Sequence, residues 1–325
     1  MQRPIVDRPS DGGVAHGSWT GAYSRGVANR QLRTVFSGGA FFEGPRWHEG
    51  GWWASDFYRH RVSRYHPDGT EEVVVEVEAQ PSGLGWLPDG SLVIASMKDH
   101  KVLRLAGGQL STLADLSDYC GGYVNDLVVD EAGHVFVGDF GFDLMGGGEA
   151  RGASLKRVDP DGAVTVVAEG LQFPNGSVIT PDGSTLIVGE TLGNRYTAWD
   201  LAPDGTLSNQ RVWARLGPEV TGTTVEEVLG QLVIAPDGCT LDAEGCIWAA
   251  DAVGARAVRL ASGGDVVDEV PAPEGLGVFA CALGGDDGRT LLLCGAPDFL
   301  EHNRAAAREA VLLATEVDVP HAGRP

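Results

Sequence analysis

Six segments of the chain share one frame, in which a Gly follows a fixed first position by eight residues and leads into an apolar segment. The frame is clearest at Asp237, where Gly245 precedes Cys-Ile-Trp-Ala-Ala. The six first positions are Glu43, Ser82, Asn125, Asn175, Asp237 and Ala280. A unit of this size cannot bury its apolar faces alone, so copies must stack on one another. This repetition constrains the fold more than any other feature.

Within each copy, short segments with alternating apolar residues are separated by tight turns. Pro-Asp-Gly triplets at Pro67, Pro160 and Pro203 close the third segment of their copies, and those at Pro88 and Pro181 lie in the first hairpin. Pro sets the φ angle that a turn needs and Gly accepts positive φ, so these are turns with a mechanism. Short strands with such turns form antiparallel meanders. The sequence therefore predicts an all-β, six-bladed β-propeller with four-stranded blades.

A propeller is closed by joining its two chain ends in one blade. Residues 33–36 (RTVF) and 310–319 (AVLLATEVDV) are the strand candidates nearest the ends, and we expect them to complete the last blade. Residues 31–325 then form a single domain. Residues 1–30 are rich in Pro, Gly and Ser without a sustained period, so an extended N-terminal arm is expected there.

Two of the spacings between copies are longer than the others. They contain a glycine-rich stretch at residues 141–152 and a second stretch at residues 216–232 that has room for a short helix. Loops of this kind at the rim of a propeller often cover a site, so both are expected to act as lids.

Composition narrows the class of partner. The net charge of −21 argues against nucleic acid, because no basic stripe is available to neutralise phosphates. No apolar run reaches the length of a membrane span and residues 1–13 lack a signal-peptide core, so a cytoplasmic protein without a membrane partner is expected. The oligomeric state stays open.

The five cysteines do not form a disulfide framework. If Asp287 and Gly288 form a two-residue turn, Cys281 and Cys294 lie directly opposite on adjacent strands. A bond there is conceivable, but a reducing cell disfavours it.

The first positions carry the chemistry. In a propeller the innermost strands line the central channel, so Glu43, Asn125, Asn175 and Asp237 are expected to converge. Carboxylate and amide oxygens suit Ca²⁺, and also Mg²⁺ or Mn²⁺, with Zn²⁺ as a less specific alternative. The eight His residues show no zinc spacing. No single residue establishes the site, because Asp237 and Asn175 are also common in ordinary turns. The occurrence of all four at the same position of their copies is what indicates a metal site.

Four stretches resemble the SMP-30/gluconolactonase family: FEGPRW, VNDLVVDEAG, FPNGSVITPDGSTLIV and PDGCTLDAEGCIWAA. The resemblance covers about residues 40–295 in consistent order. It implies a six-bladed propeller that holds one divalent cation and hydrolyses lactones. It also implies that Glu43, Asn175 and Asp237 are metal ligands, that Asn125 contacts substrate beside the metal, and that Asp237 is the general base.

The chain departs from that family at the substrate side. Sugar-lactone hydrolases of the family have Arg two positions before the substrate-binding Asn, where this chain has Tyr123. A further acidic substrate contact falls near Asp143. A phenol removes a charged, bidentate clamp and adds an aromatic face, so a lactone or ester less polar than gluconolactone is expected.

Three other functions remain open at this stage. A paraoxonase-like arylesterase and a strictosidine-synthase-like condensing enzyme share the architecture, and a non-enzymatic binding propeller could hold the cation for stability alone. A serine hydrolase is disfavoured because no GxSxG motif is present.

Overall fold

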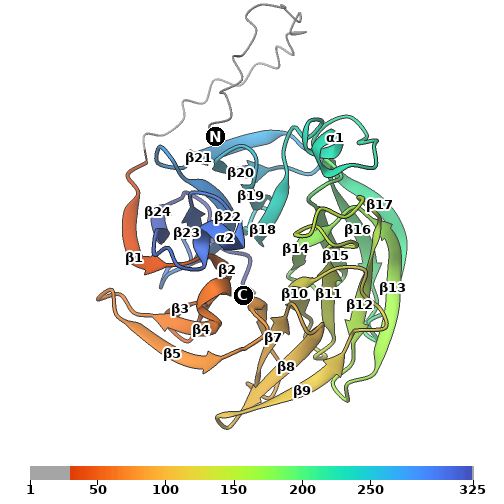
Figure 1. Cartoon of the computed structure of the whole chain (residues 1–325), viewed down its shortest axis with the longest axis horizontal. Helices are drawn as coiled ribbons and strands as arrows, with labels where there is room; N and C mark the ends of the chain where they lie inside the picture. Colours follow the sequence, from red (N-terminus) through yellow and green to blue (C-terminus); the bar gives the residue numbers. More distant parts are fainter. Residues whose placement is uncertain (1–29, 324–325) are drawn as a thin grey trace, which may run out of the picture.

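The computed structural model describes residues 30–323 and shows six four-stranded antiparallel sheets arranged radially around an axis (Figure 1). The predicted six-bladed propeller is confirmed. Most of the expected N-terminal arm, residues 1–29, lies outside the described residues.

Each of the first five blades is one continuous meander, whose strands run in chain order from the channel to the periphery. Their bounds are β2 (Phe42–His48), β3 (Gly51–Asp56), β4 (Arg61–Tyr65) and β5 (Glu71–Glu76) in blade 1; β6 (Pro81–Trp86), β7 (Leu92–Ser96), β8 (Lys101–Ala106) and β9 (Gln109–Asp115) in blade 2; β10 (Val124–Val129), β11 (Val135–Asp139), β12 (Ala153–Val158) and β13 (Val164–Leu171) in blade 3; β14 (Pro174–Ile179), β15 (Thr185–Glu190), β16 (Arg195–Leu201) and β17 (Leu207–Arg215) in blade 4; β18 (Pro236–Leu241), β19 (Ile247–Asp251), β20 (Arg256–Leu260) and β21 (Val266–Pro271) in blade 5.

Blade 6 joins the two ends of the chain. It consists of β22 (Gly277–Gly284), β23 (Thr290–Ala296), β24 (Ala310–Glu316) and the N-terminal β1 (Arg33–Gly39), which pairs antiparallel with β24. The predicted closure by the strands at the two ends is therefore confirmed. The described helical elements are a 3₁₀ turn (Phe57–Arg59), α1 (Val225–Leu229) and α2 (Glu301–Arg304). Helix α1 lies in the 216–232 insertion, as expected.

Apolar clusters fill the spaces between neighbouring blades. One such cluster joins Leu186 and Val188 of blade 4 to Phe136 and Leu155 of blade 3. Another joins Ile247 and Val258 of blade 5 to blade 4. A twisted sheet has two faces to bury, and the radial arrangement gives each face a neighbour. The stacking that the repeat requires is thus realised blade against blade.

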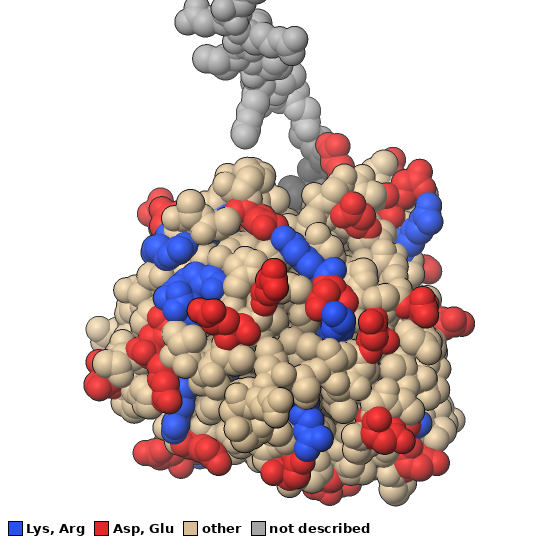
Figure 2. All heavy atoms as spheres, turned by 60° about the horizontal axis from the view of Figure 1, so that its bottom comes forward, with Lys and Arg blue, Asp and Glu red and all other residues tan. Residues whose placement is uncertain are grey.

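On the face shown in Figure 2, acidic side chains are mixed with fewer basic ones over the surface. This distribution agrees with the excess of 45 acidic over 24 basic residues. Within residues 30–323, no helix is long and apolar enough to cross a membrane.

The register of β22 corrects two expectations. Cys281 pairs with Leu293 and Cys294 pairs with Ala280, because the hairpin register differs by one residue from that of the assumed two-residue turn. The two cysteines therefore lie on opposite faces of the sheet, in different apolar clusters, and both are free thiols.

A different bulge displaces the sixth first position, because the irregularity in strand pairing spans Val278 to Ala280 in β22 but Pro236 to Cys239 in β18. Phe279 lines the central cavity that the other first positions face, whereas Ala280 packs against the backbone of Gly238. The channel position in blade 6 is therefore held by an aromatic side chain, and the assignment of Ala280 to it was wrong.

Candidate active site

Four predicted residues come together at one end of the channel. Glu43, Asn125, Asn175 and Asp237 are each the second residue of an innermost strand, and all four line one cavity, which we name the front chamber. They are between 4 % and 9 % exposed. Residues separated by up to 194 positions thus form one site because the repeat places each at the same point of its blade.

Hydrogen bonds orient the two amides in opposite ways. The Nδ2 of Asn175 donates to Asp237 Oδ1 at 2.5 Å and to Thr191 Oγ1 at 3.0 Å, while the Thr191 hydroxyl donates to the Pro236 carbonyl. Among residues 30–323 no hydrogen bond reaches the amide oxygen of Asn175, so this oxygen can face a cation. Asn125 instead accepts from Ser82 Oγ through its Oδ1 at 3.1 Å, which leaves its N–H₂ free to donate to a substrate oxygen.

The two carboxylates lack cationic partners. Glu43 accepts one long bond of 3.4 Å from the N–H of Gly44, and no ion pair reaches Glu43 or Asp237 within the described part of the chain. Burial, and then the carboxylates of Asp237 and Asp126, raise the pKa of Glu43 well above its ordinary value. Burial, and then Asp126, raise the pKa of Asp237 to about 8. A bound cation would relieve this uncompensated negative charge.

This donor set fits a divalent cation with oxygen ligands. Glu43 and Asp237 would supply charged oxygens and Asn175 a neutral one, which is the chemistry that Ca²⁺ prefers. The set contains only two carboxylates. Across residues 30–323 no group of three or more His, Cys, Asp and Glu side chains has metal-binding proximity.

The raised pKa values predict how the cation-free protein responds to pH. Between about pH 4 and pH 8 the folded protein holds a proton on Asp237 that the unfolded chain has released, so the free energy of unfolding falls as pH rises through this range. One group contributes at most about 1.4 kcal/mol per pH unit. Urea unfolding in EDTA should give a higher midpoint near pH 5 than near pH 8, and Asp237→Asn should flatten this dependence. Parallel pH profiles for the two proteins would contradict the assignment.

The walls of the front chamber are apolar. Its volume is about 190 Å³, and eight aromatic side chains line it. They are Phe41, Phe57, Tyr58, Tyr123, Phe140, Phe173, Phe279 and Phe299. Tyr123 lies near Phe140, with ring centroids 5.9 Å apart, and packs against the buried aromatic cluster. Tyr123 is therefore part of an aromatic wall.

Asp143 lies outside the front chamber. Its carboxylate is exposed and accepts from Gly146 N at 2.8 Å. Asp143 lines a smaller neighbouring cavity, which shares four lining residues with the chamber: Tyr123, Phe140, Leu144 and Met145. The structure does not bring Asp143 together with the four buried polar residues.

Three loops cover the chamber. Leu144 and Met145 belong to the 141–152 insertion, and Val225 and Leu229 come from α1. A backbone hydrogen bond from Ala150 N to Thr223 O at 2.8 Å joins these two insertions. The segment before α2 adds Phe299, whose carbonyl accepts from the Tyr58 hydroxyl at 2.6 Å, and Lys98 pairs with Glu301 at 2.9 Å. The sequence did not indicate this third cover, because its residues follow no repeat.

Sequence reasoning also missed the residues that position the site. Second strands end in a fully buried acid in four blades: Asp56, Asp139, Glu190 and Asp251. Each accepts backbone N–H groups from the segment leading into the innermost strand of its own blade, including those of Phe41, Gly122, Gln172 and Ala235. These bonds fix the chain just before each polar first position. The endings WWASD, VFVGD, LIVGE and IWAAD were the available signal.

Comparison with known proteins adds family evidence. Residues 41–296 match the family model described as SMP-30/Gluconolactonase/LRE-like region. The chain is 31 % identical over 252 residues to the pentonolactonase XacC of Haloferax volcanii, covering 75 % of this chain and 78 % of that protein. It is 26 % identical over 287 residues to a 6-deoxy-6-sulfogluconolactonase of Pseudomonas putida, covering 84 % and 89 %.

Solved structures agree on the fold. A calcium-binding regucalcin from Agrobacterium tumefaciens superposes with a TM-score of 0.72 at 22 % identity, covering 92 % of this chain and 97 % of that one. A gluconolactonase from Xanthomonas campestris gives a TM-score of 0.66 at 23 % identity, covering 90 % and 91 %.

Proposed function

Since the chain belongs to the SMP-30/gluconolactonase/LRE-like family, we propose that it is a divalent-metal-dependent hydrolase that opens a lactone less polar than a sugar lactone. One observation carries the proposal: two buried carboxylates and the amide of Asn175 line the same largely apolar chamber. The named activities of the relatives support lactone hydrolysis.

Each residue has a separate task in this mechanism. A bound cation, Ca²⁺ in the first instance, supplies Lewis-acid polarisation of the ester carbonyl and acidifies water. Glu43, Asn175 and Asp237 hold it. Asp237 would also take the proton of the attacking water and return it to the ring oxygen as the ester C–O bond breaks. Asn125 donates from its free amide to the substrate and orients the ring.

The walls explain the preference for a less polar substrate. A polyhydroxylated sugar ring would lose its water without gaining hydrogen bonds from Phe140, Phe173 or Phe279. An alkyl or aryl substituent would gain from the same contacts. The aromatic lining also favours an arylesterase activity as a second candidate.

A panel of esters tests the proposal. In a pH-indicator assay, dihydrocoumarin and δ-decalactone should be hydrolysed with at least about tenfold higher kcat/KM than glucono-δ-lactone, because each buried CH₂ contributes about 0.8 kcal/mol. EDTA should abolish acid release, and Ca²⁺ or Mn²⁺ should restore it. Phenyl acetate reports the arylesterase alternative. Activity that persists in EDTA would defeat the proposal. So would a protein that hydrolyses none of the lactones and whose only response to EDTA is a lower Tm.

Tyr123→Arg tests the specificity residue. A guanidinium at this place can donate two hydrogen bonds to ring hydroxyls, so kcat/KM for glucono-δ-lactone should rise several-fold while that for δ-decalactone falls. Tyr119→Arg is the matched control, because Tyr119 is exposed and does not line the front chamber. If both variants shift the preference equally, or neither does, Tyr123 does not set it.

A further inference from the structure

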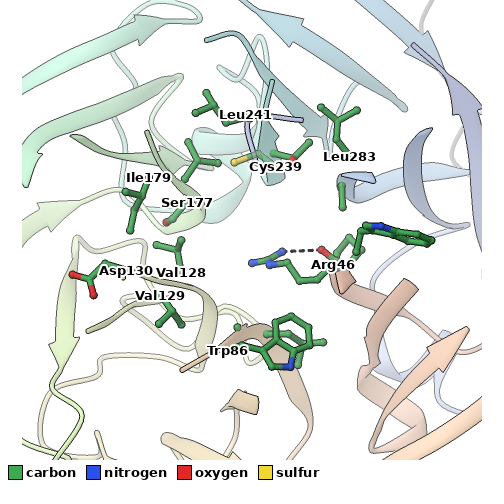
Figure 3. Close-up of a pocket in the computed structure, with 18 of the residues that line it drawn as sticks. Arg46, Trp86, Val128, Val129, Asp130, Ser177, Ile179, Cys239, Leu241 and Leu283 are labelled. Atoms are coloured by element: carbon green, nitrogen blue, oxygen red, sulfur yellow. Dashed lines mark hydrogen bonds between the residues drawn. The ribbon is translucent and has the colours of Figure 1, made fainter. Parts of the chain in front are cut away.

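A second cavity lies at the opposite end of the channel. The front chamber is lined by the first residues of the innermost strands, whereas this rear cavity is lined by their later residues, including Trp86, Val129, Leu241 and Leu283 (Figure 3). Its volume is about 240 Å³, which is larger than that of the front chamber. It shares no lining residue with the front chamber.

A buried arginine projects into the rear cavity. Arg46 is only 7 % exposed, and Figure 3 shows its guanidinium extending into the space that the labelled side chains surround. It donates to Pro45 O at 2.9 Å, to Leu127 O at 3.0 Å and to Asp126 Oδ1 at 3.4 Å. These three bonds use at most three of its five N–H donors, so two donors remain for a guest.

The charges around the cavity favour a neutral guest. The positive charge of Arg46 is already balanced by Asp126, and Asp130 and Glu131 stand among the lining residues. Asp130 is itself satisfied, because it accepts from Ala132 N and His134 N and pairs with the His134 ring. An anion would therefore meet acidic groups on its way to a guanidinium that has a partner.

Most of the remaining wall residues are apolar, with Ser177 and Thr240 as the polar exceptions. Trp86 lies at one side and Leu241 at the other (Figure 3), and Trp47 and Leu283 also line the cavity. The Trp86 ring is stacked on His48 at a centroid distance of 3.9 Å. Water against such walls finds few hydrogen-bond partners, so an apolar guest that replaces it is favoured. A pocket with mostly apolar walls and a few polar groups is typical of a small-molecule site.

We propose that the rear cavity is a second binding site, for a small neutral molecule with an apolar body and one carbonyl or ether oxygen that accepts from Arg46. This site does not depend on the hydrolytic function of the front chamber. Its volume lies below that of pockets for drug-sized ligands, so a single ring is the expected size.

Cyclohexanone is the probe that tests it. Crystals of the unmodified full chain soaked in cyclohexanone should show the ring between Trp86 and Leu241, with its oxygen within hydrogen-bond distance of Arg46. In solution, ligand-observed NMR should give a Kd that Arg46→Met raises by about tenfold or more, because a hydrogen bond from a charged donor is lost.

Substitutions that fill one cavity or the other with a Trp side chain show in which cavity the probe binds. Leu241→Trp should abolish binding at the rear site, and Leu229→Trp, which fills the front chamber, should leave it unchanged. Leu283→Trp provides a second filling variant from another blade if Leu241→Trp does not fold. The proposal is overturned if the soaked ring occupies only the front chamber, if the rear-cavity variants bind as the unmodified protein does, or if cyclohexanecarboxylate binds there more tightly than cyclohexanone.

Discussion

Asp237→Ala should lower kcat/KM for every lactone that the protein hydrolyses by at least about 10³-fold. The change removes a cation ligand and the general base together, and a general base alone contributes about 10²- to 10⁴-fold. The fold should survive, because the deleted carboxylate is buried without a cationic partner among residues 30–323 and its removal relieves repulsion with Glu43 and Asp126. Steady-state kinetics and urea unfolding measure the two effects.

The matched control is Asp182→Ala, since Asp182 is also the middle residue of a Pro-Asp-Gly triplet, in the hairpin between β14 and β15. Asp182 accepts hydrogen bonds from the side chains of Thr180 and Ser184 in an exposed hairpin turn. Its loss should cost a little stability and leave kcat/KM unchanged. Full activity in Asp237→Ala, or equal losses of kcat/KM in the two variants, would show that Asp237 is an ordinary turn residue without a catalytic role.

Lys156→Met should lower the free energy of unfolding by about 3–5 kcal/mol. Lys156 and Asp139 form a fully buried ion pair, and removing one partner leaves an uncompensated buried charge. Asp139 also accepts the N–H groups of Gly121 and Gly122, just before Tyr123 and Asn125, so a weakened pair should loosen this wall of the chamber. Urea denaturation at neutral pH gives the stability change.

Lys101→Met is the control for that measurement. Lys101 pairs with Asp99 at 3.0 Å, but both side chains are about one-third exposed. An exposed pair of this kind contributes about 0–1 kcal/mol. Similar losses in the two variants would contradict the structural role assigned to the buried pair.

The convergence of the four polar first positions could be predicted from the sequence because it follows from the repeat. A Gly eight residues after each first position places Glu43, Asn125, Asn175 and Asp237 at equivalent points, and the radial architecture then brings them together. The closure of blade 6 followed from the strand candidates nearest the two ends for the same reason. Periodicity and turn chemistry carry this information locally.

The features that were predicted wrongly or missed depend on contacts between residues far apart in the sequence, which local sequence patterns do not encode. The β22–β23 register separated Cys281 from Cys294, and the irregularity in pairing between Val278 and Ala280 accompanies the entry of Phe279 into the channel. The four buried acids at the ends of the second strands were overlooked, because an acidic residue at a strand end is usually exposed. Only the structure shows which backbone N–H groups they accept from. The cover before α2 and the rear cavity arise from side chains that meet only in the closed ring.

The most direct test of the central claim is an anomalous-difference map from crystals grown with Mn²⁺. The account predicts one strong peak in the front chamber, about 2.0–2.6 Å from oxygens of Glu43, Asn175 and Asp237. A map with no peak between these three side chains, or with its only peak elsewhere on the protein, would contradict it.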